Sequence, residues 1–146
     1  MGEFSGGFRT AGAGSTTLPI ASLYAVAGTT FSLREVAVFN TTAVAVVLAL
    51  RFLTSTGTQG TGRDELNRNA GVGGTPQCTL FDTHTGGPTI TAGNLALFPL
   101  GGVIGSGVIR TFKGIVVPKG TTNGVGLVVL TGTGQICDVD WDWDEI

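Results

Sequence analysis

The chain ends DVDWDWDEI, a run in which charged and large apolar side chains alternate with a period of two. In an extended strand the four aspartates from Asp138 to Asp144 point to one face, and the valine and two tryptophans between them point to the other. The spacing therefore predicts a strand with one wet face and one dry face. It leaves open whether the tryptophans face the chain's own core or a neighbour. It also leaves open whether the aspartates meet water or arginines.

The rest of the chain has a similar rhythm of short apolar runs bounded by turn residues. Glycine accounts for 25 of the 146 residues and threonine is also abundant, and neither favours the interior of a helix. Turn signals recur about every 8–12 residues, which is typical of a sandwich or barrel. We expect an all-β, antiparallel β-sandwich of about eight strands. The expected strands cover 17–27, 31–40, 43–54, 77–85, 88–100, 107–118, 123–134 and 135–145.

The length of 146 residues suits one domain with a substantial core. Residues 1–15 are rich in glycine and predict a flexible N-terminal arm, either disordered alone or ordered against a partner. Residues 16–146 would form the single sandwich domain. Within it, 55–75 is polar and rich in glycine, which predicts a long exposed loop with a short helical turn around Asp64–Asn69.

The segment 43–54 is the clearest strand, and it is apolar on both faces. Val44, Val46, Leu48, Leu50 and Phe52 share one face at a period of two, and the other face carries mostly alanine and valine. Such a strand is either central in a sandwich or packed against another subunit.

Charged residues make up only 12% of the chain, against about 25% in typical globular domains. This leaves little solubilising surface for a free monomer and favours a chain covered by copies of itself or by a partner. The net charge of −2 gives no argument for nucleic acid. The acids gather at the C-terminus, where an acidic strip could either be solvated or pair with a neighbouring copy.

No apolar run approaches the roughly 18 residues of a membrane span, and the N-terminus lacks the pattern of a secretory signal. We therefore expect no membrane association, and reduced, buried Cys78 and Cys137.

Catalytic and metal-binding patterns are weak. His84 is the single histidine, with Asp82 two residues away on the same strand face, but no nucleophile elbow is present because Ser106 stands in a GSG loop. A zinc site would need Cys78, His84 and Cys137, which include no close ligand pair. We predict no enzyme activity, no catalytic residue and no cofactor.

The aspartates are weak candidates for a cation site. Neighbours on one strand face lie about 6.5–7 Å apart, whereas calcium needs six or more oxygens at about 2.4 Å. We therefore predict no metal site, with Asp138, Asp140 and Asp142 as the only candidates. Basic residues that could neutralise the strip are Arg34, Arg51, Arg110 and Lys113.

Paired tryptophans can stack on sugars, but they more often anchor a core or an interface. The residues that we expect to contact a partner are aromatic or basic and lie in the arm, the long loop and the last strand. They are Phe4, Phe8, Arg9, Arg63, Arg68, Trp141 and Trp143.

Three stretches, LREVAVFNTTAVAVVLALRFLT, TLFDTHTGGPTI and PKGTTNGVGLVVLTGTGQICDVDWDWDE, resemble small β-rich virion structural proteins of tailed bacteriophages. The resemblance runs from about Thr16 to Glu145. It implies a jelly-roll-like sandwich and a structural role, either on the capsid or in the tail, and it supplies no active-site residues.

The resemblance and the low charge together predict a capsid decoration protein at the virion surface, and the resemblance implies that it is made in the host cytoplasm. It would act as a homo-oligomer, most simply a trimer, that binds the major capsid protein or another virion protein. The alternative is a tail or fibre module that binds a host receptor or glycan through Trp141 and Trp143.

Overall fold

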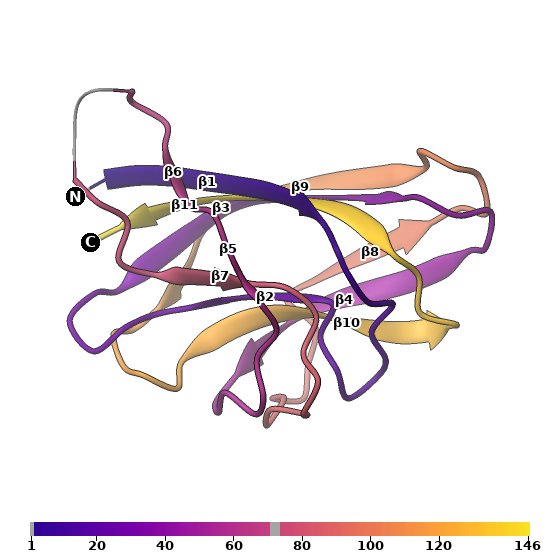
Figure 1. Cartoon of the computed structure of the whole chain (residues 1–146), viewed down its shortest axis with the longest axis horizontal. Coiled ribbons are helices and arrows are strands. Elements are labelled where there is room, and N and C mark those ends of the chain that lie inside the picture. The colour runs from indigo at the N-terminus through magenta and orange to yellow at the C-terminus, as the bar shows by residue number, and fades with distance from the viewer. Residues whose placement is uncertain (1, 71–73) are drawn as a thin grey trace.

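The alternating C-terminal segment forms a strand in the middle of a five-stranded antiparallel sheet (Figure 1). The computed structural model describes residues 2–70 and 74–146, so residue 1 of the predicted arm and residues 71–73 of the predicted loop lie outside the described residues. The order of this first sheet is β6 (Leu66–Asn67), β1 (Gly2–Arg9), β11 (Cys137–Glu145), β3 (Phe31–Asn40) and β9 (Gly107–Val117).

A second antiparallel sheet packs against the first. Its order is β5 (Gly62–Arg63), β7 (Thr79–Phe81), β2 (Ala21–Tyr24), β10 (Gly124–Gly132), β4 (Val46–Leu53) and β8 (Ala96–Leu100). The chain passes repeatedly from one sheet to the other, so strands that are far apart in sequence become neighbours. The predicted antiparallel β-sandwich is confirmed. Eight of its strands have four or more residues, and β5, β6 and β7 are shorter.

The prediction of a flexible N-terminal arm is wrong for residues 2–9, because these form β1. This strand pairs with β11 along its whole length, from Gly2 opposite Glu145 to Arg9 opposite Asp138. Phe4 is 1% exposed, and its ring lies 6.2 Å from that of Trp143. The glycines that suggested a free arm instead let β1 pack closely, since a Cβ on Gly6 would lie 2.6 Å from a Leu80 methyl carbon.

The predicted loop at 55–75 contains two short strands and no helical turn. β5 pairs with β7 in the second sheet and β6 pairs with β1 in the first, so the segment crosses one edge of the sandwich. This edge is thereby covered, which protects β1 from pairing with other chains. No helix occurs among the residues that the structure describes, and hence none that could span a membrane.

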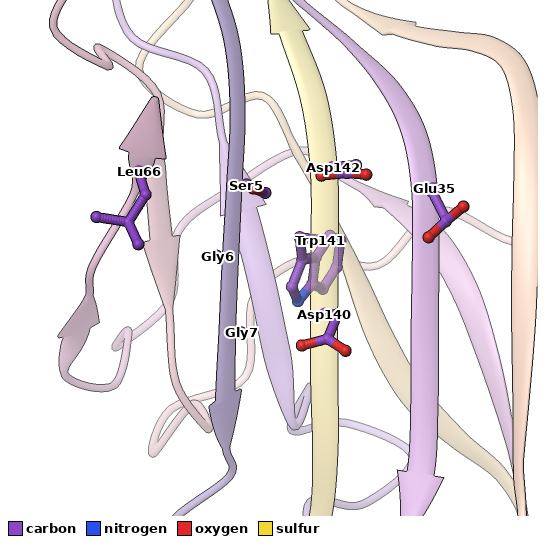
Figure 2. Close-up of a pocket in the computed structure, with 8 residues that line it drawn as sticks. All are labelled: Ser5, Gly6, Gly7, Glu35, Leu66, Asp140, Trp141 and Asp142. Atoms are coloured by element: carbon purple, nitrogen blue, oxygen red, sulfur yellow. The ribbon is translucent and has the colours of Figure 1, made fainter. Parts of the chain in front are cut away.

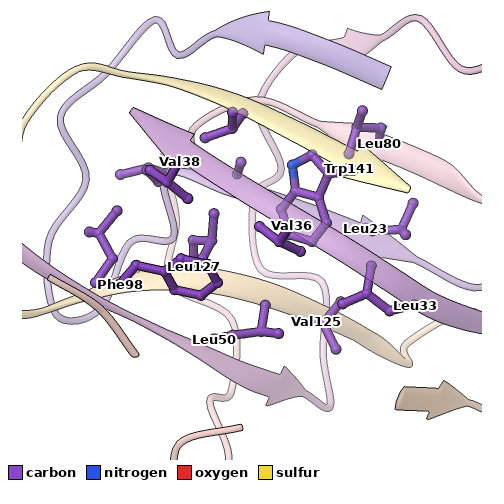
Figure 3. Packing of buried hydrophobic residues seen from close by; sticks show 14 of the residues in the cluster. Leu23, Leu33, Val36, Val38, Leu50, Leu80, Phe98, Val125, Leu127 and Trp141 are labelled. Atoms are coloured by element: carbon purple, nitrogen blue, oxygen red, sulfur yellow. The ribbon is translucent and has the colours of Figure 1, made fainter. Parts of the chain in front are cut away.

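The core lies between the two sheets (Figure 3). Trp141 and Trp143 of β11 enter it and are 1% and 0% exposed. β4, which lies between β10 and β8, supplies Leu48 and Leu50, both fully buried. It begins at Val46, so Val44 lies outside it and is 50% exposed. Cys78 and Cys137 are buried and unpaired. Apolar side chains at a period of two thus meet across the sandwich, as in other packed β-sheets.

The position of β1 is testable by substitution. Phe4→Ala should lower the free energy of unfolding by about 3 kcal/mol or more, because it removes a large buried ring against Trp143. Glu3→Ala, one residue away on the exposed face, should change it by about 0.5 kcal/mol or less. Urea denaturation monitored by tryptophan fluorescence measures both. Equal, small effects would mean that residues 2–9 are not part of the fold.

Candidate interaction surface

The outer face of the first sheet carries the four aspartates of β11 side by side with residues of β1 and β3. On β1, Arg9 lies opposite Asp138 and Gly7 opposite Asp140. On β3, Glu35 lies opposite Asp142. Because alternate residues of one strand point to the same face, the four aspartates form an acidic strip along β11, and Glu35 adjoins it from β3.

One end of the strip is neutralised by the strand that was expected to be a free arm. Arg9 donates two hydrogen bonds to Asp138, Nε to Oδ1 at 2.8 Å and Nη2 to Oδ2 at 3.0 Å. This bidentate contact lowers the pKa of Asp138 below its ordinary value. Arg9 was expected to contact a partner, but here its guanidinium is held within the chain.

The other end of the strip is neutralised by two arginines from different segments. Arg34 of β3 donates to Asp144 at 2.6 Å, which confirms one of the four basic residues proposed as its neutralising partners. Arg68 follows β6; its Nη2 lies 3.3 Å from Asp144 Oδ1, and its Nε lies 3.7 Å from Asp142 Oδ1. The other three proposed residues do not pair with the strip: Arg51 donates to Asn94, and Arg110 donates to the Leu97 carbonyl oxygen. Lys113 has no ion pair within the described residues, and its carbonyl oxygen accepts from Arg34 Nη1 at 3.1 Å.

The middle of the strip keeps its negative charge. Asp140 and Glu35 have no ion pair within the residues that the structure describes, and with Asp142 they border a shallow cavity of about 270 Å³ (Figure 2). Gly6 and Gly7 border its other side, where they add no side chains. Partial desolvation by the flanking strands raises the pKa of Asp140, and the like charges of Asp138 and Asp142 raise it further.

The strip does not converge on a cation. In residues 2–70 and 74–146, no three His, Cys, Asp or Glu side chains are grouped closely enough to hold a metal ion. Of the three weak candidates, Asp138 is occupied by Arg9 and Asp142 lies near Arg68, and the strand geometry keeps Asp140 apart from both.

The tryptophans are placed inside the sandwich, so Trp141 and Trp143 are not available to contact a partner or a sugar from the surface. Trp143 donates its indole N–H to Glu145 at 3.1 Å, and Glu145 also accepts from the backbone of Gln77 and Cys78. The same correction applies to Phe4, whose ring is in the core.

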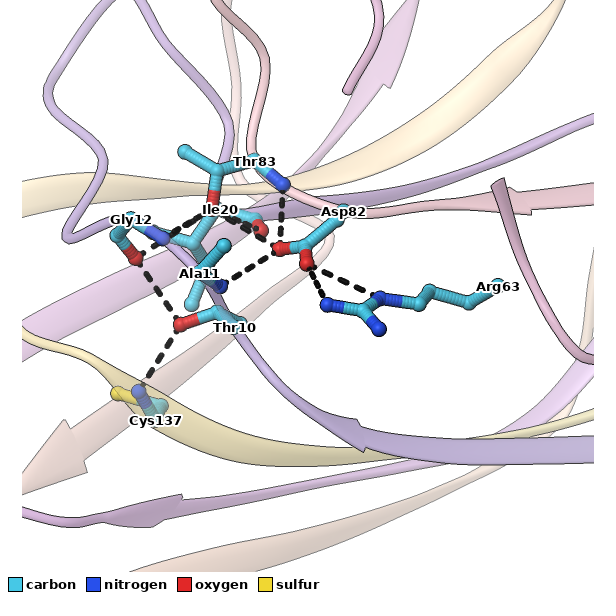
Figure 4. Close-up of polar contacts among 8 residues, drawn as sticks. All are labelled: Thr10, Ala11, Gly12, Ile20, Arg63, Asp82, Thr83 and Cys137. Atoms are coloured by element: carbon cyan, nitrogen blue, oxygen red, sulfur yellow. Dashed lines mark hydrogen bonds and ion pairs between the residues drawn. The ribbon is translucent and has the colours of Figure 1, made fainter. Parts of the chain in front are cut away.

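Phe8 and Arg63 support the interior rather than an open surface. Arg63 Cζ lies 5.2 Å from the centre of the Phe8 ring, and its guanidinium pairs with the buried Asp82. Asp82 also accepts from the backbone of Ala11 at 2.9 Å and of Thr83 at 2.7 Å (Figure 4). Burial alone would raise the pKa of Asp82, but these donors together hold it below its usual value.

The geometry separates Asp82 from His84, which the sequence placed on one strand face. His84 is 1% exposed and its Nε2 lies 2.8 Å from the hydroxyl of Ser22, which is also buried. Burial lowers the pKa of His84. The pair is therefore a contact inside the core with no solvent access at the serine.

Sequence reasoning missed Glu35 as a member of the acidic surface. The sequence pattern gave no clear signal for it: Glu35 is the one acid in the strand 31–40, but a period of two groups it with Phe31 and Leu33, which are buried. A bulge at Arg34, which the pairings with β11 and β9 both skip, turns Glu35 to the outer face. What the sequence lacked was the neighbour relation, because β3 and β11 are separated by most of the chain and their register is set by a bulge between Asp142 and Trp143.

No family model, curated protein or solved structure matches the chain.

The unpaired middle of the strip gives a pH-dependent prediction. A carboxyl whose folded pKa lies above its unfolded value destabilises the fold at higher pH, and this cost disappears as the pH falls through the folded pKa. Asp140→Asn should therefore stabilise the chain at pH 7. Because solvent screens this exposed side chain, the gain should be about 0.5 kcal/mol or less.

The control is Asp138→Asn, which removes the partner of Arg9 and should lower stability at pH 7. Thermal melts of both variants and the parent chain at pH 7 and pH 3 measure the effect. A loss of stability in Asp140→Asn at pH 7, or a gain that is as large at pH 3, would contradict the assignment.

Proposed function

We propose that the chain is a structural protein of a tailed-bacteriophage virion, and specifically a capsid decoration protein that binds the outside of the shell as a small homo-oligomer. The observation that carries the proposal is the combination of few charges with exposed aliphatic side chains. Charged residues are 12% of the chain, and Val44, Val103, Ile104 and Ile109 are each at least half exposed. Surfaces of this kind are typical of permanent assemblies.

The sequence resemblance to β-rich phage virion proteins supports the same proposal. It extends over β2 to β11, which the structure assigns to one β-sandwich. A rigid sandwich with loops gathered at its ends suits a part that adds contacts to a lattice. Fold alone does not define function, so the surface properties carry the argument.

The glycan-binding alternative rested on exposed tryptophans. A sugar stacks on an aromatic face that solvent can reach, whereas both indoles here are in the core. This removes the residues that had favoured a tail or fibre module, and we do not propose that role.

The proposal is tested by counting the chain in purified virions of the phage that encodes it. Quantitative mass spectrometry should give a copy number comparable to that of the major capsid protein. Cryo-electron microscopy should place the density on the outer surface of the head. A few copies per particle, or density in the tail, would overturn the proposal.

A binding experiment tests the same proposal with purified components. Recombinant chain added to shells that lack it should bind until the surface sites are filled, and should raise the temperature at which the shells rupture. An unrelated protein of similar size and net charge, added under the same conditions, should not bind. Saturable binding without any gain in shell stability would contradict a cementing role.

A further inference from the structure

One end of the sandwich exposes aliphatic side chains and carries no charge. It is formed by three connecting segments, 41–45, 101–106 and 131–136, whose sequences are TTAVA, GGVIGS and TGTGQI. We call this the charge-free end. In Figure 1 it lies opposite the end at which the two termini are found.

The three segments are in direct contact. The Thr41 backbone N–H donates to the Ile136 carbonyl oxygen at 3.3 Å, and the Thr42 hydroxyl donates to Gln135 at 2.6 Å. A Cβ on Gly102 would lie 3.1 Å from the Ala43 carbonyl oxygen, so 101–106 runs closely beside 41–45. The charge-free end is therefore one surface, not three separate loops.

A buried asparagine fixes this surface from behind. Asn40 is 1% exposed, and its Nδ2 donates to the carbonyl oxygens of Val44 at 2.7 Å and Gly101 at 3.1 Å. Its backbone N–H donates to Ser106 at 2.7 Å and its carbonyl accepts from Gly105 at 2.8 Å. Because the loops are already ordered, a partner binding there incurs little entropy cost.

The aliphatic side chains on this surface are the most exposed of their kind. Val103 and Ile104 are 69% and 71% exposed, the highest values among the large hydrophobic residues that the structure describes. Val44 at 50% and Ile136 at 37% lie on the adjoining segments. Single exposed aliphatics are common on protein surfaces, but four grouped on a rigid, uncharged end indicate a contact surface.

The absence of charge favours a second copy of this chain as the occupant. Residues on the rotation axis of a cyclic oligomer meet their own copies, so a charge on the axis faces a like charge. The acidic strip could not lie there, since its unpaired Asp140 would face another Asp140. The charge-free end meets itself without that cost, and the nearby Asp138 is already paired with Arg9.

We infer that the charge-free end lies on the rotation axis of a homo-oligomer, where Val103 and Ile104 of neighbouring copies pack together. The inference rests on the proposed function only in requiring that the chain form an oligomer. It does not depend on what the oligomer binds.

The test joins equivalent residues across the axis. Ile104→Cys should form a disulfide between copies when copper–phenanthroline supplies the oxidant, which removes two electrons and two protons from the paired thiols. The native cysteines are buried and should not react. The control is Val116→Cys. Val116 is 55% exposed and lies at the end of β9 away from the charge-free end, so this variant should stay monomeric on a non-reducing gel.

A second variant tests the interface without a covalent cross-link. Sedimentation of the parent chain should show one species at a multiple of the chain mass. Ile104→Asp should raise its dissociation constant by about a hundredfold or more, because it places like charges together at the axis. Val116→Asp should not, and circular dichroism should show both variants folded.

Three results would overturn the inference. They are a parent chain that is monomeric at all concentrations, an oligomer that Ile104→Asp leaves intact, and cross-linking as efficient at residue 116 as at 104. If the chain is monomeric but Ile104→Asp abolishes binding to shells, this surface docks on the capsid. The inferred self-association is then wrong, and the proposed decoration role stands without its homo-oligomer. If the oligomer behaves as expected but shells are not bound, the proposed function fails alone.

Discussion

The structure depends on β11 lying between β1 and β3 with its aspartates outside and its tryptophans inside. A one-residue shift in register would exchange the two faces and place four carboxylates in the core. Each unpaired buried carboxylate would cost several kcal/mol of folding free energy, so the shifted register is not populated. The alternation in β11 therefore fixes how β1 and β3 pair with it. The indoles then form the inner surface against which the second sheet packs. The carboxylates on the outer face are stabilised where arginine side chains lie beside them.

Those cations come from three separate parts of the chain. Arg9 on β1, Arg34 on β3 and Arg68 beyond β6 each reach the strip, while Asp140 in its centre has no ion-pair partner among the described residues. The exposed pairs add little stability individually, but their positions agree with the strand order that the core requires. The molecule thus has an acidic outer face and, separately, an uncharged end. The two surfaces suit different contacts, since only the uncharged end can meet its own copy without repulsion.

The sequence was sufficient for the features that period-two alternation determines. It predicted the sandwich, the two faces of 138–144 and the burial of both cysteines, because each depends on local pattern. It could not place residues whose role depends on a distant neighbour. The glycines of 2–9 indicated an arm because their partner strand β11 is far away in the sequence. The spacing of Asp82 and His84 allowed a contact between them, but Asp82 pairs with Arg63 and His84 contacts Ser22. The exposure of Val103 and Ile104 could not be predicted either, because a glycine-rich loop has no alternating pattern that distinguishes exposed from buried positions.

The central claim is that residues 2–9 are a strand of the folded unit, paired with β11 along its length. Amide hydrogen exchange followed by NMR tests this residue by residue. The account predicts that amides of 137–145, together with the paired amides of 2–9, exchange only at the rate of global unfolding. Fast exchange throughout 2–9, while β3 and β11 remain protected, would show that the N-terminal segment is not a strand of this sheet and would contradict the account.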